Sequence, residues 1–522
     1  MTTATKITYT STSGDLEEFH LRFDDALDGI RRDADQLHAF YIAGEPVQTP
    51  DDPLVVRSPI DTKLVLGRFS AARVADVNSA VHAARRSQRD WASRSWQDRV
   101  SLLRGAASII RERKYELAAL MSLEVGKSRL EAMGDAEESA DLIDYYCQQV
   151  EDANGFVRPM NRITPAERNT DVLRPYGVFA CIAPFNFPLA LSAGMSSAAL
   201  VAGNTVVYKP AEETPWTGLK LYQIYRDAGI PPGVFNLLFG RREVIGDPLW
   251  QHPGVDGVVF TGSKQVGMRI HAGLSGGWIK PALLELGGKN AAIVLRTADL
   301  DAAAEGVMRS AFSLQNQKCS ATSRVYVQRE VSSPFLERLI EKTRSIRMGD
   351  PSQRDVFFGP VINQRSVERF ERAVSQARAE GTVLLGGERM KGGIFDRGYF
   401  VAPTIARLPL DSTLYRDELF VPFLAVGEVS GLDQALAETN RADYGLTAGI
   451  FSGDQAELAR FFDEVEAGVC YANKRTGATT GAWPGAQPFC GWKGSGSTGK
   501  GGCGPYYVAQ FMREQSRTVI EG

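Results

Sequence analysis

The stretch VFACIAPFNFP, residues 178–188, decides the fold of this chain. Its first six residues are apolar throughout, which is typical of a parallel strand buried on both faces. The prolines that follow place Asn186 in a loop beyond the end of that strand. A second apolar run, residues 281–284, leads into the motif ELGGK in the same way. Loops after such strands carry reactive groups in open α/β sheets, so we expect both loops to belong to a functional site.

Outward from this stretch, apolar runs alternate with helical stretches. We therefore expect a doubly wound α/β nucleotide-binding layout, followed by a second α/β region that begins at residue 285. The expected strands are residues 178–183, 205–208, 234–238 and 257–261 in the first region, and 291–295 and 324–328 in the second. The expected helices of the second region lie near residues 299–315 and 332–346.

The part of the chain before residue 150 is predicted to be mainly helical. Residues 15–40 form a polar amphipathic pattern, and we expect its apolar stripe to pack against the main body. That stripe consists of Phe19, Phe23, Leu27 and Ile30. Further along, one helix is expected to begin at Val74 and another to span residues 97–121.

Length and composition bound the class of protein. A chain of 522 residues exceeds a single core, so two or three domains are expected. The net charge of −3 gives no general attraction to nucleic acid or to an anionic membrane. The sequence has no long apolar stretch and no signal pattern, so we expect no membrane partner and a cytoplasmic location. Its cysteines and histidines form neither a disulfide framework nor a metal-ligand spacing, so no metal is expected.

Three loops offer a thiol, a carboxylate and an amide that suit chemistry at a carbonyl. Cys319 lies in the polar segment QNQKCS, and a thiolate is a good nucleophile. None of the five histidines lies in a motif that would give the thiol a histidine base. We interpret the other cysteines as buried small hydrophobic residues: Cys147, Cys181, Cys470, Cys490 and Cys503.

Glu285 is the candidate base, because it ends an apolar run and desolvation raises the pKa of a carboxyl group. The alternative for Glu285 is an ion pair with Lys289. Asn186 is the candidate donor to an oxyanion, with the Cys319 backbone N–H as the second donor. The alternative for Asn186 is a turn-stabilising side chain.

The segment GSGSTG, residues 494–499, matches the G-x-G-x-x-G phosphate-binding fingerprint in letters only. No strand is predicted before it and no helix after it, so the context that positions a phosphate is missing. We interpret it as a glycine-rich connection.

The motifs resemble those of the NAD(P)-dependent aldehyde dehydrogenase superfamily from about residue 41 to the C-terminus. KPAE (209–212), FTGS (260–263) and ELFVP (418–422) occur in the family's order. The separations of 133 residues from Asn186 to Cys319 and 34 from Glu285 to Cys319 are also similar.

The resemblance implies a fold: α/β, with a Rossmann-type cofactor domain, an α/β catalytic domain and a β-strand oligomerisation arm. The implied NAD(P)-binding domain comprises residues 1–155 and 177–284, and the catalytic domain residues 285–487. The arm comprises residues 156–176 paired with a C-terminal strand in residues 488–522. A homodimer or higher homo-oligomer is implied.

The resemblance also implies a cofactor site. Lys209, counted among the catalytic residues as well, and Glu212 would hold the adenosine ribose hydroxyls. Ser263 would approach the pyrophosphate, Glu418 would bind the nicotinamide ribose, and Phe420 would lie beside the nicotinamide. The remaining expected cofactor residues are Ile182, Ala183, Pro184, Phe185, Gly246, Glu285 and Leu286.

The choice between NAD and NADP depends on a departure from the family's pattern. Arg242 stands where the family usually has glycine. Arg241 and Arg242 could reach a 2′-phosphate, whereas Glu212 repels one. We expect NAD, and NADP use is left open.

A group within the family, the glutamate-γ-semialdehyde (1-pyrroline-5-carboxylate) dehydrogenases, is similar in TGA (476–478), QPF (487–489) and KCSA (318–321). In that group the substrate's α-carboxylate would be bound by residues matching Ser320, Gly477 and Ala478, and an exposed backbone N–H suits an anion. Phe187 and Phe489 would form aromatic walls. The alternative for residues 477–478 is an ordinary turn. Residues 479–486 are longer than in the pattern, and Trp483 there could fill the anchor pocket and favour another acidic or aromatic aldehyde.

The expected reaction is the oxidation of an aldehyde to a carboxylic acid. Cys319 would form a thiohemiacetal, hydride would pass to the nicotinamide, and Glu285 would activate the water that cleaves the thioester. A CoA-acylating dehydrogenase is an alternative, against which Glu285 argues because only hydrolysis needs that base. A catalytically silent structural member is another, although Cys319, Glu285 and Asn186 are all present.

Overall fold

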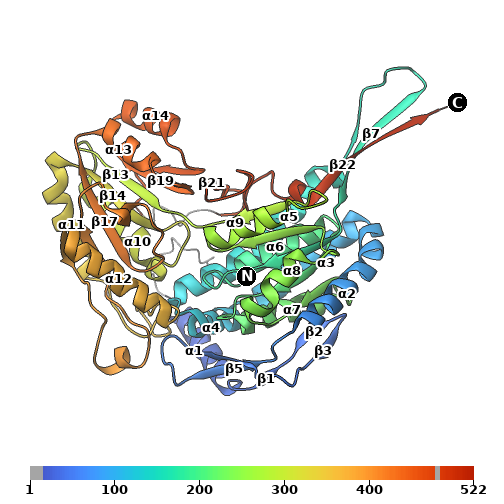
Figure 1. Cartoon of the computed structure of the whole chain (residues 1–522), viewed down its shortest axis with the longest axis horizontal. Coiled ribbons are helices and arrows are strands. Elements are labelled where there is room, and N and C mark those ends of the chain that lie inside the picture. The colour runs from blue at the N-terminus through green and yellow to red at the C-terminus, as the bar shows by residue number, and fades with distance from the viewer. Residues whose placement is uncertain (1–15, 476–482, 522) are drawn as a thin grey trace.

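The computed structural model describes residues 16–475 and 483–521. Two seven-stranded sheets lie beside each other, and a narrow arm projects from the body next to the first sheet (Figure 1). None of the helices in the described ranges combines the length and apolar character needed to cross a membrane. The architecture is the expected α/β fold.

The first sheet is parallel except for its last two strands. In spatial order it contains β12 (Ala282–Glu285), β11 (Gly257–Thr261), β8 (Val178–Ile182), β9 (Thr205–Lys209), β10 (Phe235–Leu237), β2 (Phe40–Ile42) and β3 (Glu45–Val47). The chain runs from β8 through β9 to β10 on one side and returns to β11 and β12 on the other. The order therefore reverses between β8 and β11, and ligands bind outside the carboxyl ends of strands at such a reversal.

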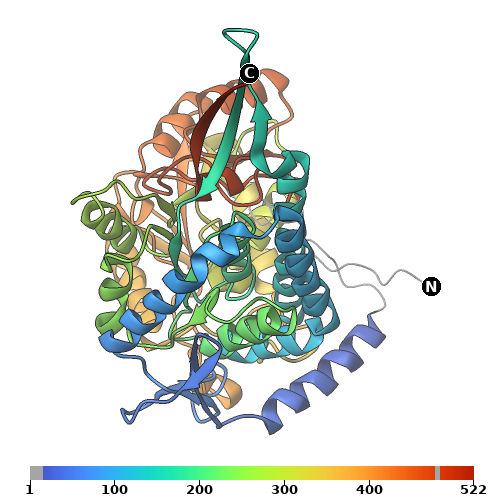
Figure 2. The same cartoon turned by 90° about the vertical axis from the view of Figure 1, so that its right-hand side faces the viewer.

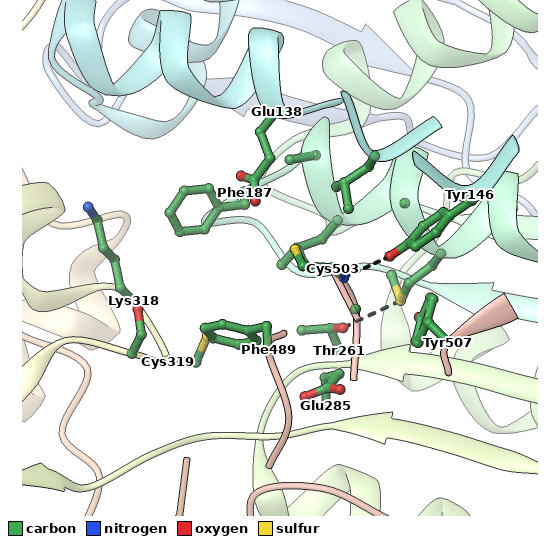
Figure 3. Close-up of a pocket in the computed structure, with 17 residues that line it drawn as sticks. Glu138, Tyr146, Phe187, Thr261, Glu285, Lys318, Cys319, Phe489, Cys503 and Tyr507 are labelled. Atoms are coloured by element: carbon green, nitrogen blue, oxygen red, sulfur yellow. Dashed lines mark hydrogen bonds between the residues drawn. The ribbon is translucent and has the colours of Figure 1, made fainter. Parts of the chain in front are cut away.

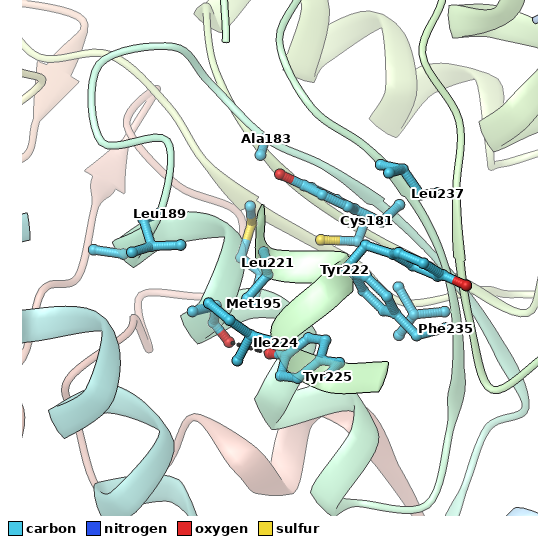
Figure 4. Packing of buried hydrophobic residues seen from close by; sticks show 14 of the residues in the cluster. Cys181, Ala183, Leu189, Met195, Leu221, Tyr222, Ile224, Tyr225, Phe235 and Leu237 are labelled. Atoms are coloured by element: carbon cyan, nitrogen blue, oxygen red, sulfur yellow. Dashed lines mark hydrogen bonds between the residues drawn. The ribbon is translucent and has the colours of Figure 1, made fainter. Parts of the chain in front are cut away.

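Helices before residue 280 surround this first sheet. They are α1 (Glu17–Arg32), α2 (Val74–Ser93), α3 (Trp96–Glu112), α4 (Lys114–Val125), α5 (Arg129–Asp152), α6 (Ala190–Val201), α7 (Pro215–Asp227), α8 (Asp247–Gln251) and α9 (Lys264–Gly273). Helices α6 and α7 pack against β8, β9 and β10 through a buried cluster that includes Met195, Leu221, Tyr225 and Phe235 (Figure 4). The Tyr225 hydroxyl forms a hydrogen bond of 2.9 Å with the Ser196 hydroxyl, so the buried ring keeps a polar partner.

The second sheet has the spatial order β15 (Thr382–Leu385), β16 (Thr404–Arg407), β17 (Phe423–Val429), β14 (Thr322–Gln328), β13 (Asn290–Val294), β19 (Thr447–Phe451) and β20 (Val469–Ala472). Its helices are α10 (Leu300–Phe312), α11 (Ser332–Arg344), α12 (Gln364–Glu380), α13 (Leu432–Asn440) and α14 (Gln455–Glu464). Two small sheets complete the body: β1 (Leu37–His38), β5 (Val65–Phe69) and β4 (Leu54–Arg57), and the pair β18 (Tyr444–Gly445) with β21 (Trp492–Lys493). The expected domain boundaries stay a prediction.

The arm is a three-stranded antiparallel sheet of β6 (Val157–Pro159), β7 (Glu167–Pro175) and β22 (Met512–Ile520) (Figures 1 and 2). β22 pairs with β7 along its full length, from Met512 opposite Pro175 to Ile520 opposite Glu167. The expected pairing of segment 156–176 with the C-terminal strand is therefore present.

Most of the expected elements are present, with strand boundaries shifted by at most two residues. The apolar stripe of α1 is buried as expected. The expected helix over residues 15–40 is too long, since α1 ends at Arg32, Asp35 has a positive φ of 58°, and Leu37 begins β1.

Two other expectations were wrong. The predicted helix over residues 97–121 is two helices that meet at Arg113, whose φ of −98° and ψ of 11° leave the helical region. The break lets α4 bury nearly all of its circumference, whereas α3 buries one face. Cys470 and Cys490 are partly exposed rather than buried. In β20 the buried residues are Val469 and Tyr471, so Cys470 takes the opposite face of the strand.

Candidate active site

A cavity lies between the two sheets, where loops from both meet helix α5 and the C-terminal segment (Figure 3). Cys319, Glu285, Ser320, Phe187 and Phe489 all line it, so the structure brings these sequence-predicted residues together. The other lining residues are Glu138, Leu142, Tyr146, Ala190, Leu191, Gly194, Met195, Thr261, Lys318, Gly502, Cys503 and Tyr507.

The loop that carries Cys319 has an unusual backbone. Leu314, Gln315 and Asn316 have consecutive positive φ values of 48°, 55° and 59°, which L-residues rarely adopt. The Asn316 side-chain amide donates to the carbonyls of Ala311, at 2.8 Å, and Thr322, at 2.9 Å, on either side of the loop. Strain of this kind clusters at functional sites and persists where surrounding contacts determine it.

Asn290, the first residue of β13, holds the carbonyl of the nucleophile in place. Its side-chain N–H groups donate to Cys319 O at 2.7 Å and to Ala321 O at 2.8 Å, and its oxygen accepts from the Thr447 N–H at 3.0 Å. Gly288 permits this close approach, because a Cβ there would lie 2.4 Å from Cys319 O. A glycine two residues before Asn290 is therefore a steric requirement of the loop.

Burial, together with the nearby carboxylates of Glu418 and Glu285, raises the pKa of Cys319 to about 12. The backbone N–H groups of Ser320 and Cys319 act in the opposite direction. The thiol is therefore mainly protonated at neutral pH in this arrangement, and its ionisation requires a base in the cavity or a cationic ligand beside it.

Glu285 ends β12, and the glycine-rich segment runs antiparallel beside that strand. The Leu286 N–H donates to Ser495 O at 2.8 Å, and the Leu284 N–H donates to Ser497 Oγ at 3.0 Å. The segment 494–499 is thus a connection along the edge of the first sheet. A Cβ on Gly501 would lie 2.7 Å from Glu285 Oε1, so glycine leaves room for the carboxyl group.

The Glu285 carboxyl group is desolvated, which raises its pKa well above the usual range. Its Oε2 is buried and has no hydrogen-bond partner among the described residues. The alternative ion pair with Lys289 does not form there, since Lys289 Nζ is likewise buried and unpartnered in the described ranges. Burial lowers the pKa of Lys289 to about 7.

Asn186 is buried, and its side-chain N–H donates to Gln317 O at 2.9 Å, which joins its loop to that of Cys319. A charged pair, Asp135 of α5 and Lys127 just before that helix, supports the same loop from behind. Asp135 accepts from the Ala190 N–H and from Lys127 Nζ, both at 2.7 Å, and neither charged side chain is exposed.

Phe187 lies close to two ammonium groups that are paired elsewhere. Lys127 Nζ is 3.9 Å from the centre of the ring and Lys318 Nζ is 5.8 Å from it. Lys318 pairs with Glu131 at 2.8 Å. The position of the Phe187 ring therefore depends on the buried ammonium groups of Lys127 and Lys318, which no sequence motif predicted.

On the cofactor side, Glu418 lies against the loop after β12. Its Oε1 accepts from the Gly288 N–H at 2.9 Å, and a Cβ on Gly287 would lie 2.0 Å from its Oε2. Burial raises the pKa of Glu418 to about 7. Phe420, with a φ of 56°, packs edge-on against Phe185 at 5.9 Å between ring centres.

Lys209 and Glu212 follow β9. Lys209 is buried, and its Nζ donates to Pro210 O at 3.3 Å. Glu212 Oε1 accepts from the Arg242 N–H at 2.7 Å, while the Arg242 guanidinium pairs with Glu243 at 2.8 Å. Arg242 is thus held by its backbone, with its charge directed to an exposed acidic partner.

The remaining expected cofactor residues end or follow strands of the first sheet. Ser263 caps α9, where its Oγ accepts from the Val266 N–H at 3.4 Å, and the N-terminus of a helix favours a phosphate. Gly246 ends a short helical turn, Arg242–Gly246, and Leu286 is buried. Ile182 ends β8, followed by Ala183, Pro184 and Phe185.

The expected anchor residues Gly477 and Ala478 lie outside the described residues. Of the longer segment 479–486, the described part turns back onto α5. Trp483 Nε1 donates to Asp141 Oδ2 at 2.8 Å, and Trp483 is not among the residues that line the cavity.

Several wall residues were missed from the sequence. Tyr146 from α5 and Tyr507 near the C-terminus pack together at 5.2 Å between ring centres, and the Tyr146 hydroxyl accepts from the Cys503 N–H at 3.2 Å. Cys503, interpreted as a buried hydrophobic residue, is indeed buried, but it also faces the cavity. The signal that could have found them is weak, because their partners lie more than 350 residues apart in the chain.

Similarity to known proteins extends along almost the whole chain. The sequence profile of the aldehyde dehydrogenase family matches residues 47–516. A protein of Geobacillus sp. (strain WCH70) named 1-pyrroline-5-carboxylate dehydrogenase is 35% identical over 505 residues, 96% of each chain. The solved 1-pyrroline-5-carboxylate dehydrogenase from Thermus with bound NAD is 34% identical, covers 100% of both chains and has a TM-score of 0.93. Betaine aldehyde dehydrogenase from Staphylococcus aureus in complex with NAD+ is 26% identical, covers 96% of this chain and 97% of its own, and has a TM-score of 0.89.

Proposed function

The chain belongs to the aldehyde dehydrogenase family, and on that premise we propose that it oxidises glutamate γ-semialdehyde, the open form of 1-pyrroline-5-carboxylate, with NAD. One observation carries the proposal: a single cavity holds the thiol of Cys319, the desolvated carboxyl group of Glu285 and the Ser320 residue, with two aromatic walls. The full-length similarity to proteins named 1-pyrroline-5-carboxylate dehydrogenase supports the substrate.

In the first step the Cys319 sulfur attacks the aldehyde carbon, and the carbonyl oxygen becomes an oxyanion. The sulfur attacks as the thiolate after its proton has passed to solvent, and the positive charge of a bound nicotinamide would favour that ionisation. Glu285, which lines the same cavity, then stays free of this proton for the hydrolysis step. Asn186 donates one side-chain N–H to Gln317 O. Its second side-chain N–H would donate to the oxyanion, together with the Cys319 backbone N–H.

The residues at the carboxyl ends of β8, β11 and β12 fit a dinucleotide. The Ser263 end of α9 suits the pyrophosphate, and Gly287 leaves the space that the Glu418 carboxylate needs to face the nicotinamide ribose. NAD would supply the acceptor for the hydride that leaves the thiohemiacetal carbon. Phe185 and Phe420 would wall the nicotinamide, and Lys209 with Glu212 would hold the adenosine ribose.

Loss of the hydride leaves a thioester on Cys319. Glu285 then removes a proton from a water molecule, whose oxygen attacks the thioester carbon, and the C–S bond breaks to release the carboxylic acid. A carboxyl group whose pKa is raised by burial is a stronger base when ionised, so the desolvation of Glu285 serves this step.

The substrate's α-carboxylate would be bound by Ser320 together with the backbone of Gly477 and Ala478. Phe187 and Phe489 would pack against its aliphatic part. Because the chain pairs Arg242 with Glu243 and uses Glu212 to hold the Arg242 backbone, a 2′-phosphate would meet the Glu212 carboxylate first. NAD is therefore the proposed cofactor.

We further propose that two copies associate through the arm. The outer edge of β22 has a row of backbone groups that another strand can pair with, and Val519 and Ile520 on it are exposed. A cytoplasmic location remains a prediction from composition.

The test is a comparison of kcat/KM for glutamate γ-semialdehyde and for pentanal, a neutral aldehyde of equal length, with NAD. Donors left unpaired in the pocket cost about 1–3 kcal/mol each, so pentanal should be about 10-fold to 100-fold worse. Ser320→Ala should reduce the difference in kcat/KM between the two aldehydes while activity on pentanal remains. Equal efficiency on both aldehydes would contradict the carboxylate site and leave the family's reaction standing.

A second candidate substrate is an aromatic aldehyde. The cavity beyond Cys319 is walled by Tyr146, Tyr507, Leu142 and Met195, which suit a ring. Benzaldehyde oxidised better than both aliphatic aldehydes would favour this reading.

A further inference from the structure

A second cavity lies where the arm joins the body, away from the residues of the first. It is enclosed by the end of α2, the start of α3, the turn Asn154–Phe156, strand β7 and strand β22. Figures 1 and 2 show the arm leaving the body at this place. Four arginines line the cavity, Arg94, Arg99, Arg174 and Arg517, and no acidic residue does.

Arg99 is the most buried of the four. Its Nε donates to Val201 O at 2.9 Å and its Nη1 to Arg94 O at 2.6 Å, so its charge is bonded to neutral carbonyls. Burial lowers the pKa of Arg99 to about 10, and Asp98, the acidic neighbour that opposes this shift, does not line the cavity. A guanidinium group stays charged at neutral pH under these conditions.

Two more arginines lie on one face of the arm. Thr170, Val172 and Arg174 of β7 are opposite Arg517, Gln515 and Arg513 of β22. Residues opposite each other, and those two apart on one strand, share a face of an antiparallel sheet. Val172 is buried and lines the cavity, so Arg174 and Arg517 are on the face that the cavity occupies.

Arg517 and Arg94 also have uncharged neighbours. Arg517 donates through Nε and Nη2 to Gln515 Oε1, at 3.1 and 2.8 Å. The Arg94 guanidinium carbon lies 5.9 Å from the centre of the Trp91 ring. Within the described residues, none of the four guanidinium groups forms an ion pair with a carboxylate.

The opposite wall of the cavity is preformed. Trp96 packs directly on Gly155, which has a φ of 66°, and a Cβ there would lie 2.2 Å from the indole Cδ1. Glycine is therefore required where the turn meets the ring. This contact involves none of the four arginines.

Uncompensated positive charges in one cavity repel each other, and an anion among them removes that repulsion. Guanidinium groups have planar sets of donors that match phosphate oxygens, and charge-assisted bonds of this kind are strong. We propose that this cavity binds a small, multiply charged phosphate anion, such as pyrophosphate or the diphosphate of a nucleotide. The ligand would join α3 to both long strands of the arm and make their junction rigid.

The experiment uses the full-length protein saturated with NAD, so that the dinucleotide site is filled. Pyrophosphate is titrated calorimetrically at constant ionic strength against a chloride control. We expect saturable binding of one anion per chain and slower amide hydrogen exchange in residues 157–175 and 512–520. Loss of one charged hydrogen-bonding partner weakens binding about tenfold or more, and this is expected for Arg94→Gln and for Arg174→Gln.

Arg162→Gln is the matched control, because Arg162 belongs to the same arm but bonds to Pro165 O outside the cavity. Its affinity for pyrophosphate should equal that of the wild type. Arg174→Lys, which keeps the charge but not the planar donors, should fall between wild type and Arg174→Gln, and it provides a readout if the glutamine variant fails to fold. If ADP binds more tightly than pyrophosphate, the site recognises a nucleotide. If the two bind equally, the site recognises the phosphate groups alone. No saturable binding above the chloride control, or equal weakening by Arg162→Gln, would overturn the proposal.

Discussion

Asp135→Asn tests whether the buried charges behind the active-site loop hold it in place. Asp135 and Lys127 pair at 2.7 Å with no exposed surface on either side chain. Asparagine keeps the shape and can still accept the Ala190 N–H, but it removes the negative charge. The Lys127 ammonium group is then left in the interior, 3.9 Å from the centre of the Phe187 ring and without its counter-charge.

The size of the effect follows from this burial. Breaking a buried ion pair by removing one partner costs about 3–5 kcal/mol, because the remaining charge stays desolvated. The same change in an exposed pair costs about 1 kcal/mol or less. Arg104–Glu151 provides that comparison, since its side chains are 41% and 33% exposed. Glu151→Gln is therefore the matched control.

The assay is urea unfolding followed by circular dichroism, combined with kcat and KM below the transition. Asp135→Asn should lower the unfolding midpoint clearly, and Glu151→Gln should barely move it. Lys127→Met combined with Asp135→Asn should recover most of the loss, since methionine removes the stranded ammonium group. KM should rise in the single variant as the Phe187 wall shifts. A loss of stability no larger than that of the control would refute the reasoning.

Three further predictions concern the reaction itself. Cys319→Ser should abolish aldehyde oxidation, because a hydroxyl is a far weaker nucleophile than a thiolate. Tryptophan fluorescence should still report NAD binding by this variant. Near wild-type turnover would show that Cys319 is not the nucleophile. Glu285→Gln should give a burst of NADH in the first turnover and then a slow steady state, since glutamine cannot take a proton from water. In the wild type the steady-state rate should rise with pH as Glu285, whose pKa is raised well above its usual range, loses its proton, and this rise should be missing in Glu285→Gln; equal slowing of burst and steady state would argue against a deacylation base. kcat/KM should be higher with NAD than with NADP. Glu212→Gln should lower the NAD/NADP ratio of kcat/KM, because it removes the repulsion between the Glu212 carboxylate and the 2′-phosphate. A wild-type preference for NADP would show that attraction by Arg242 exceeds repulsion by Glu212.

The strands of the first sheet could be predicted because burial on both faces leaves a plain trace in the sequence. β8, Val178–Ile182, is apolar at each position, so its place needed no knowledge of its neighbours. The break at Arg113 could not be predicted in the same way, because neither proline nor glycine marks it. It depends on how α3 and α4 are covered by other elements, which is a property of tertiary packing.

In the candidate site, too, some residues could be predicted from local sequence and others depend on tertiary packing. Cys319, Glu285 and Asn186 lie in recognisable motifs, and the cavity brings the first two together with the loop of the third. Tyr146 and Tyr507 form part of the same wall, yet neither lies in a motif, and only their contact across the folded chain reveals them. Reactive side chains lie in local sequence motifs that can be recognised, whereas the side chains that form the cavity wall do not.

The walls of the cavity also have an order in time. A ribosome releases the chain from residue 1 onward, so both large sheets are complete before Phe489, Cys503 and Tyr507 emerge. Until those residues arrive, the space around Cys319 lacks one side, although the thiol and Glu285 are already made. A chain that stops before residue 489 lacks these wall residues, so its thiol would be open to solvent on that side. Competence to bind an aldehyde in a closed pocket is acquired in the last stage of synthesis.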